Sequence, residues 1–318
     1  MSFEPVIGLE IHVQLNTRTK LFCGDSTNFG DDPNSNVCPV CLGLPGALPV
    51  LNANAVRLAI RAGIGLGCTI HPESVFARKN YFYPDLPKGY QITQYDRPFA
   101  TNGSLHGVAI RRVHLEEDAG KLLHDRLANR TAIDLNRAGA PLIEIVTEPD
   151  IYSAKDARAF LNRLKQVLQY LDVSDCDMEK GSLRVDANVS LRPVGTTELG
   201  TKTELKNMNS FSNTERALEF EIERHRNILT QGFDVVQQTL LWDVAHNEAR
   251  PMRSKEESHD YRYFPEPDLP PLVLSEAEIS RIRDELPELP AAKAERFAAT
   301  YQLPPYDIDV LIADPKVA

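Results

Sequence analysis

Four segments of the chain alternate between apolar and polar residues, which is the pattern of a β-strand with one buried face. In residues 6–15 every second side chain is apolar, while Glu10, His12 and Gln14 occupy the opposite face. The same alternation recurs in three further segments: 110–118, 183–191 and 202–206. We therefore expect an antiparallel sheet with one apolar face and one polar face.

Other segments carry apolar residues at helical spacing, each behind a residue that commonly caps a helix. Asn52 precedes one such run, and Ser153 precedes a run that continues to Leu171. Ser212 and Ser275 each stand three residues before a glutamate, as in a capping box, so we expect a helix to begin after each of them. Together the two kinds of pattern predict the α+β class, with an antiparallel-sheet cradle.

A proline-rich stretch at residues 265–271 interrupts this pattern near the C-terminal end. Proline fixes φ and removes a hydrogen-bond donor, so the stretch should be extended and rigid. We place a domain boundary here. Residues 1–270 are expected to form the cradle domain, and residues 271–318 a linker and the start of a small all-helical domain.

Composition narrows the class of protein without identifying it. The 318 residues are 42% hydrophobic and 25% charged, as in ordinary globular proteins. The sequence has no uninterrupted apolar run of about 18 residues and no secretory signal at its N-terminus, so we expect a cytoplasmic protein without membrane contact. The net charge of −10 argues against binding nucleic acid through bulk charge.

Acidic side chains collect on the predicted polar face, with one histidine: Glu10, His12, Glu116, Glu117, Asp186 and Glu204. Carboxylate oxygens are the ligands that Mg²⁺ prefers, and carboxylates packed this closely would not all stay ionised without a cation. The alternative is a solvated face on which these acids pair with neighbouring bases, namely Arg111, Arg112, Arg184 and Lys206. We favour the magnesium site. Glu117 has the opposite parity to Glu116, so it faces away or lies where the strand ends.

A second candidate metal site comes from cysteine spacing. Cys38 and Cys41 form a Cys-x-x-Cys pair, and Cys23 and Asp25 lie upstream across a polar loop. This spacing is typical of a structural zinc site, although Asp25 stands where a fourth thiol is expected. The alternatives are a vestigial site or free thiols. We treat residues 23–41 as a zinc-knuckle-like insert.

Two further runs mix basic and aromatic residues. Residues 252–264 include Arg253, Lys255 and Arg262, which suit the oxygens of a polyphosphate. Residues 76–90 place aromatic rings beside arginine and lysine, as in surfaces that stack on nucleic-acid bases. The alternative for the second run is a loop that packs its aromatic rings into the core.

Taken together, these segments resemble the B subunit of aspartyl/glutamyl-tRNA amidotransferases. The resemblance is continuous from about residue 5 to the end of the sequence. Its motifs are long and specific, and they occupy residues 6–12, 38–52, 77–90, 114–121, 134–139, 181–190, 204–211, 252–257 and 260–264.

The resemblance implies a partner-dependent enzyme that uses ATP and Mg²⁺. The B subunit of this family phosphorylates the side-chain carboxylate of Glu or Asp misacylated on tRNA(Gln) or tRNA(Asn). Ammonia from a glutaminase A subunit then displaces the phosphate, and a small C subunit wraps the other two. The catalytic fold of the family is similar to that of glutamine synthetase.

Site roles follow from the same resemblance. The magnesium ligands would be the six residues of the acidic face. The contacts to ATP would be Arg184, Lys206, Arg253, Lys255 and Arg262. The catalytic group would be Glu10, Asp186, Lys206, Arg253 and Lys255.

This sequence departs from the family pattern at two points. Asp25 replaces a cysteine of the fuller zinc pattern, and the sequence ends at Ala318, where family members continue through the helical domain into a tail domain expected to grip tRNA. Two alternatives to the amidotransferase function stay open. One is a non-catalytic tRNA-binding or assembly module, and the other is a free-standing ligase of small molecules similar to glutamine synthetase.

Overall fold

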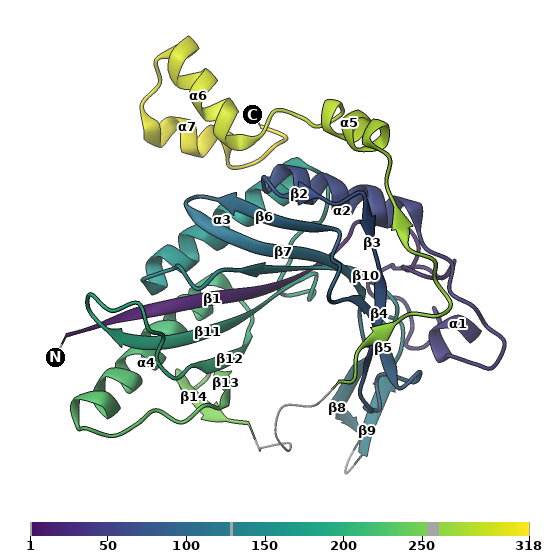
Figure 1. The fold of residues 1–318 in the computed structure, drawn as a ribbon, viewed down its shortest axis with the longest axis horizontal. Coiled ribbons are helices and arrows are strands. Elements are labelled where there is room, and N and C mark those ends of the chain that lie inside the picture. The colour runs from purple at the N-terminus through teal and green to yellow at the C-terminus, as the bar shows by residue number, and fades with distance from the viewer. Residues whose placement is uncertain (1, 128–129, 253–260, 318) are drawn as a thin grey trace.

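The computed structural model describes residues 2–127, 130–252 and 261–317. Its largest element is one mixed β-sheet (Figure 1). From one edge to the other its strands are β14 (Glu248–Pro251), β13 (Thr239–Asp243), β12 (Thr203–Met208), β11 (Leu183–Pro193), β1 (Phe3–Gln14), β10 (Pro141–Thr147), β7 (Val108–Glu117), β6 (Ala100–Leu105) and β2 (Thr69–Ile70). Within the described residues, β12 and β13 pair in parallel and the other neighbours pair antiparallel. The prediction of an α+β protein dominated by an antiparallel sheet is therefore confirmed.

Helices cover the apolar face of this sheet, as Figure 1 shows for α2 (Ala53–Gly65), α3 (Ala154–Tyr170) and α4 (Phe211–Thr230). The alternate residues Ile7, Leu9 and Ile11 of β1 are buried in one core with Phe160 and Leu164 of α3. Burial of this face leaves the other side chains of the same strands on the polar face.

The predicted helix starts hold at three of four places. The Asn52 side chain accepts hydrogen bonds from two backbone N–H groups at the start of α2, and Ser153 does the same for one at the start of α3. Ser275 and Glu278 form a reciprocal capping box at α5 (Glu276–Asp284).

The predicted start of α4 after Ser212 is wrong. The helix begins at Phe211, and Ser210 caps it by accepting a hydrogen bond from the Asn213 N–H. Ser210 has the extended backbone that a cap requires, with φ of −159°, whereas Ser212 is already inside the first turn.

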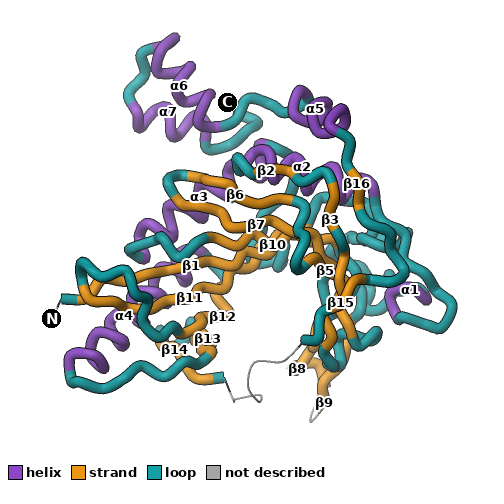
Figure 2. The backbone as a smooth tube through the Cα atoms, viewed as in Figure 1, coloured by secondary structure: helices purple, strands orange, loops and turns teal. Residues whose placement is uncertain are grey.

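Smaller sheets stand at one end of the large sheet (Figure 2). The three-stranded one has the order β15 (Phe264–Pro265), β4 (Phe76–Asn80), β5 (Tyr90–Gln94). Two pairs accompany it: β16 (Leu272–Val273) with β3 (Glu73–Ser74), and β8 (Lys121–Leu127) with β9 (Arg130–Asp134). The short helix α1 (Pro39–Leu42) belongs to the cysteine-bearing insert.

The proline-rich stretch packs against the three-stranded sheet. Glu266 is buried there, and its carboxylate accepts two hydrogen bonds of 2.8 Å from the Arg78 guanidinium of β4. After α5, the helices α6 (Pro290–Tyr301) and α7 (Pro305–Ile312) lie at the edge of the molecule in Figure 1. The Tyr170 hydroxyl of α3 donates to the Ile312 carbonyl over 2.8 Å, so α7 is attached to the cradle. Among the helices described, none combines the length and apolar character needed to cross a membrane.

Candidate active site on the polar sheet face

Strand register places charged residues opposite one another in rows across the polar face. His114 of β7 is opposite Glu144 of β10, which is opposite His12 of β1, which is opposite Arg184 of β11. In the neighbouring row Glu10 is opposite Asp186. Directly opposed Cβ atoms in antiparallel strands lie about 4.5–5.5 Å apart, so each row brings its functional groups within reach of one another.

Three residues of the first row, His12, His114 and Glu144, form a compact cluster with Glu116, which lies two residues after His114 on β7. Glu144 Oε2 lies 3.4 Å from His12 Nε2 and 3.3 Å from His114 Nε2. The Glu116 carboxylate reaches the same two nitrogens, at 3.4 Å from His12 and 3.5 Å from His114. One ligand atom from each of His12, Glu116 and Glu144 lies within 4.8 Å of the others, close enough for one cation to contact all three.

Opposite charges control protonation in this cluster. Burial by itself favours the neutral imidazole, but the carboxylates of Glu144 and Glu116 outweigh it and raise the pKa of His114 to about 9. Burial also favours the neutral form of Glu144, yet both histidines hold the pKa of Glu144 well below its ordinary value. The cluster therefore keeps its carboxylates ionised in a buried setting.

A second group follows on β1, β11 and β12. Lys206 Nζ lies 2.7 Å from Asp186 Oδ2 and 2.9 Å from Glu204 Oε1, and Asn188 Nδ2 donates to Glu10 Oε1 over 3.2 Å. Burial and then the charges of the neighbouring carboxylates raise the pKa of Glu10. One ammonium thus faces three acids, and a divalent cation would relieve the remaining repulsion.

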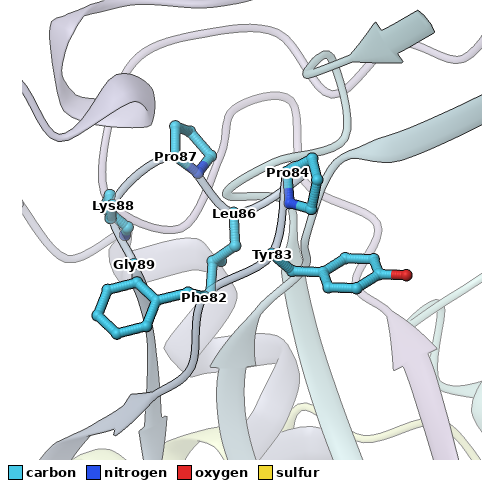
Figure 3. Close-up of a pocket in the computed structure, with 7 residues that line it drawn as sticks. All are labelled: Phe82, Tyr83, Pro84, Leu86, Pro87, Lys88 and Gly89. Carbon is cyan, nitrogen blue, oxygen red and sulfur yellow. The ribbon is translucent and has the colours of Figure 1, made fainter. Parts of the chain in front are cut away.

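A pocket of about 230 Å³ adjoins Glu10 and Asn188. Val146 and Thr147, between which the pairing of β10 with β7 shifts in register, line this pocket together with two cations, Arg111 and Lys202. A larger hollow of about 530 Å³ lies in the loop between β4 and β5 (Figure 3). Its lining is mainly proline and aromatic side chains, including the exposed Phe82, and it contains none of the carboxylates of the two rows.

The cysteine-bearing insert brings its four predicted ligands together. Cys41 Sγ lies 3.6 Å from Cys23 Sγ, 3.9 Å from Cys38 Sγ and 3.1 Å from Asp25 Oδ2. With Zn–S bonds of about 2.3 Å, tetrahedral coordination separates neighbouring sulfurs by about 3.8 Å. The spacing of the donor atoms therefore fits zinc, and the hydrogen bond from Cys23 lowers the pKa of Cys41 to about 6, toward the thiolate that binds metal.

Comparison with known proteins assigns the chain to a family. A family model described as "GatB/GatE catalytic domain" matches residues 5–280. The chain belongs to this family. It is 56% identical to the B subunit of the aspartyl/glutamyl-tRNA(Asn/Gln) amidotransferase of Chlorobium chlorochromatii, and that alignment covers 100% of this chain and 68% of the relative. The same protein of Caldanaerobacter subterraneus is also 56% identical over the same shares, and that of Persephonella marina is 55% identical over 99% and 68%.

In this member of the GatB/GatE family, the structure collects most of the predicted acidic face. Glu10, His12, Glu116, Asp186 and Glu204 share the polar face of the large sheet. Glu117 does not join them. Its Oε1 accepts hydrogen bonds from Lys88 Nζ and from the Ile92 N–H of β5, so this carboxylate is paired with Lys88 and β5, not with the histidines. Strand parity separates these adjacent glutamates, and the expectation that Glu117 belongs with the acidic face needs correction.

The predicted basic residues are distributed differently. Lys206 lies among the carboxylates, whereas Arg184 donates 2.8 and 3.0 Å hydrogen bonds to Asp118 and is anchored at the end of the first row. Arg262 precedes β15, where its carbonyl accepts a hydrogen bond from Asn80 Nδ2. Arg253 and Lys255 lie outside the described residues.

Three members of this site were absent from the sequence-based selection: Glu144, His114 and Asp118. Glu144 was hidden because its face of β10 otherwise carries the apolar Leu142 and Val146. Its position between Ile143 and Ile145 is the available signal, since alternation places it on the polar face of a strand. Alternation in residues 110–118 already places His114 and Asp118 on the same face as Glu116, but neither was included among the candidate ligands.

Proposed function

We propose that this chain is the ATP-dependent subunit of a tRNA amidotransferase. It would phosphorylate the side-chain carboxylate of Glu or Asp misacylated on tRNA(Gln) or tRNA(Asn), for amidation by ammonia from a partner glutaminase subunit. A small third subunit would complete the complex. The relatives' names support this function. The observation that carries it is the alternation of carboxylates and cations across five adjacent strands, β7, β10, β1, β11 and β12.

The proposed reaction has two steps. A carboxylate oxygen of the aminoacyl group attacks the γ-phosphorus of ATP, the bond to the β–γ bridging oxygen breaks, and ADP leaves. Ammonia then attacks the acyl carbon, inorganic phosphate leaves, and one ammonia proton passes to that phosphate. Phosphoryl transfer depends mainly on positioning and on neutralising the oxygens that carry charge.

The charged rows suit this task. Lys206 stands between Asp186 and Glu204 and would hold a phosphate oxygen at a fixed place. Arg184, held by Asp118, would keep its charge oriented toward the first row. For Arg253, Lys255 and Arg262 we propose contacts to ATP on the basis of the sequence alone.

The donor set on this face fits magnesium. Oxygen ligands dominate, His12 adds one nitrogen, and Glu144 extends the predicted set of ligands, which are Glu10, His12, Glu116, Asp186 and Glu204. Bound Mg²⁺ would withdraw charge from the phosphate oxygens. The histidines and carboxylates would keep the site ordered and ionised before nucleotide enters.

We also propose the remaining features of this assignment. These are a cradle similar to that of glutamine synthetase, a boundary near residue 270, a small helical domain beginning in residues 271–318, a cytoplasmic location and a zinc ion on Cys23, Asp25, Cys38 and Cys41. The match of the family model ends at residue 280, inside α5, which supports the boundary. The tetrahedral spacing of the four donors supports the zinc.

The deciding experiment assembles the protein with its partner subunits and measures conversion of Glu-tRNA(Gln) to Gln-tRNA(Gln). We expect the product only when ATP and Mg²⁺ are present. Withholding glutamine should leave ADP formation and an acid-labile phosphoryl group on the aminoacyl-tRNA. If the intact complex forms no product that depends on ATP, the proposed function is wrong.

The same assay separates the two alternatives. If Glu10→Ala and Asp186→Ala leave amidation intact but weaken tRNA binding, the chain is a binding or assembly module. This face disfavours the RNA-binding alternative, because its clustered carboxylates repel the phosphates of RNA. Amide formation from free glutamate without tRNA would instead identify a small-molecule ligase.

A further inference from the structure

Two tyrosines form a parallel stack beside the candidate active site. The rings of Tyr95, just after β5, and Tyr263, just before β15, have centroids 4.0 Å apart and planes that differ by 3°. Tyr95 remains 44% exposed although one face of its ring is covered by Tyr263. A flat aromatic surface is therefore held in place and accessible.

Other side chains fix this stack from behind. Tyr261 meets Tyr263 edge to face at 5.9 Å, and it meets Tyr81 in the same way at 6.1 Å. Lys79 Nζ lies 4.7 Å from the centre of the Tyr261 ring, which adds a positive charge to the array. A ring fixed by several neighbours loses little conformational entropy when a ligand stacks on it.

Strand β5 connects the stack to the cluster of two histidines and two glutamates. Thr93 Oγ1 donates a 3.1 Å hydrogen bond to Glu116 Oε2. Tyr95 is the second residue after Thr93, at the bend that follows β5, so the tyrosine stack lies next to the end of the strand that bonds Glu116. Burial, then Tyr261, then the charges of Glu144 and Glu116 raise the pKa of Tyr263, in keeping with this proximity.

We propose that the exposed face of Tyr95 stacks on the unpaired adenine at the 3′ end of the aminoacyl-tRNA. This inference rests on the proposed function and adds a subsite to it. The amino acid is esterified to the ribose that carries this adenine. Stacking of the base on Tyr95 would therefore place the side-chain carboxylate near the first row. Bases of single-stranded RNA commonly bind to aromatic side chains in this way.

The position of Lys206 favours the tRNA base over the adenine of ATP as the ligand of Tyr95. Lys206, our proposed phosphate contact, lies on β12, four strand spacings or about 19 Å from the β7 side where Thr93 holds Glu116. In-line transfer brings donor and acceptor to opposite sides of the moving phosphorus. The tyrosine stack thus lies on the acceptor side.

The test uses the assembled complex and a misacylated tRNA whose terminal adenine is replaced by the fluorescent base 2-aminopurine. Stacking on tyrosine should quench this base when the tRNA binds. In Tyr95→Ala we expect the quenching to disappear and the KM for aminoacyl-tRNA to rise about tenfold, with the KM for ATP unchanged. Tyr95→Phe keeps the ring and should behave as the wild type. Tyr306→Ala, which removes a tyrosine that is 77% exposed on α7, should also leave the signal intact.

Two outcomes would overturn the stacking proposal while leaving the proposed function in place. One is unchanged quenching and an unchanged KM for tRNA in Tyr95→Ala. The other is a rise in the KM for ATP in place of tRNA, which would make the stack a nucleotide subsite. Failure of the wild-type complex to amidate would instead contradict the proposed function.

Discussion

The polar sheet face and the cysteine-bearing insert both gather ligands for a cation, but they do so by different means. The sheet face takes its groups from adjacent strands, and register alone makes Glu144 the neighbour of both His12 and His114. In the insert, all four donors lie in one loop segment around the four-residue helix α1. Strand pairing holds the first site together, whereas the second has little regular structure around its donors.

This difference separates what a metal would do in each place. The sheet face retains its geometry through backbone pairing, so a cation bound there would serve chemistry. The insert has little regular structure around its donors, so a cation bound there would serve structure. Removal of each metal should therefore have different consequences.

The largest expected effect is loss of zinc from the insert. Replacing Cys38 and Cys41 together by serine should lower bound zinc from about one equivalent to below about a tenth, because hydroxyls are poor zinc ligands. Elemental analysis of the purified protein measures this directly. Cys68→Ser and Cys176→Ser, at cysteines outside the cluster, serve as controls. Wild-type protein with less than about a tenth of an equivalent would contradict the zinc assignment.

On the sheet face, Glu144→Gln should reduce kcat/KM for ATP-dependent amidation by about a hundredfold or more, while the fold persists. The change removes the negative charge that both histidines contact. Substitution of residues that only hydrogen-bond to metal ligands already lowers metal affinity or activity about 10–100-fold. Steady-state kinetics and thermal unfolding of the same samples separate activity from stability. The matched control is Glu148→Gln, which alters an exposed carboxylate paired with Arg111. Equal activity of both variants would exclude Glu144 from the site.

Glu221 of α4 provides a reference carboxylate whose charge is balanced by protein donors. Burial favours its neutral form, but hydrogen bonds from Arg224, His225 and Thr203 lower its pKa from 4.5 to about 2. This shift corresponds to about 3 kcal/mol of stability, which is present above about pH 5 and is lost as the pH falls toward 2. Glu221→Gln should therefore be less stable than wild type by up to about that amount at pH 7, with the gap closing in acid.

Denaturant unfolding at several pH values measures the effect. Glu219→Gln, at an exposed position of the same helix, should follow the wild-type curve. A pH-independent gap between Glu221→Gln and wild type would show that lost packing, not lost charge, accounts for the effect.

The smallest effect concerns Lys20, a fully buried residue beside the insert. Its Nζ lies 3.3 Å from Cys41 Sγ and 2.7 Å from the Asn36 carbonyl oxygen. Three thiolates and a carboxylate would give a zinc complex a net charge of −2, and the ammonium would offset part of it. Lys20→Met should therefore weaken zinc binding about tenfold in a chelator competition. Lys88→Met, which removes the buried partner of Glu117, should leave zinc affinity unchanged. An equal loss of zinc affinity in both variants would show that removing any buried lysine in this region destabilises the insert.

Strand parity accounts for most of what could be predicted from the sequence. Glu10 and His12 were found because the apolar residues around them alternate cleanly, and the same alternation separates Glu116 from Glu117. Glu144 was not predicted as a site residue, because Leu142 and Val146 make its strand look uniformly apolar. Spacing along the chain predicted the cysteine cluster for the opposite reason, since its ligands are local in sequence.

Contacts between distant segments were beyond such rules. The stack of Tyr95 on Tyr263 joins residues far apart in the chain, and only the arrangement of β5 and β15 on either side of β4 brings them together. The start of α4 was misplaced by two residues because Ser210 and Ser212 are both competent caps, and backbone conformation selects between them.

At the end of β7 two adjacent glutamates make different contacts. Glu116 contacts the histidines, whereas Glu117 contacts Lys88 and the backbone of β5. Inserting one residue ahead of this pair would exchange their directions, because side chains in a strand repeat with a period of two. The Glu116 carboxylate would then point toward Lys88, and Glu117 would take the face that now carries His114 and Asp118. Insertions in this strand should therefore be tolerated only when an even number of residues is added, even where the added residues are small and polar.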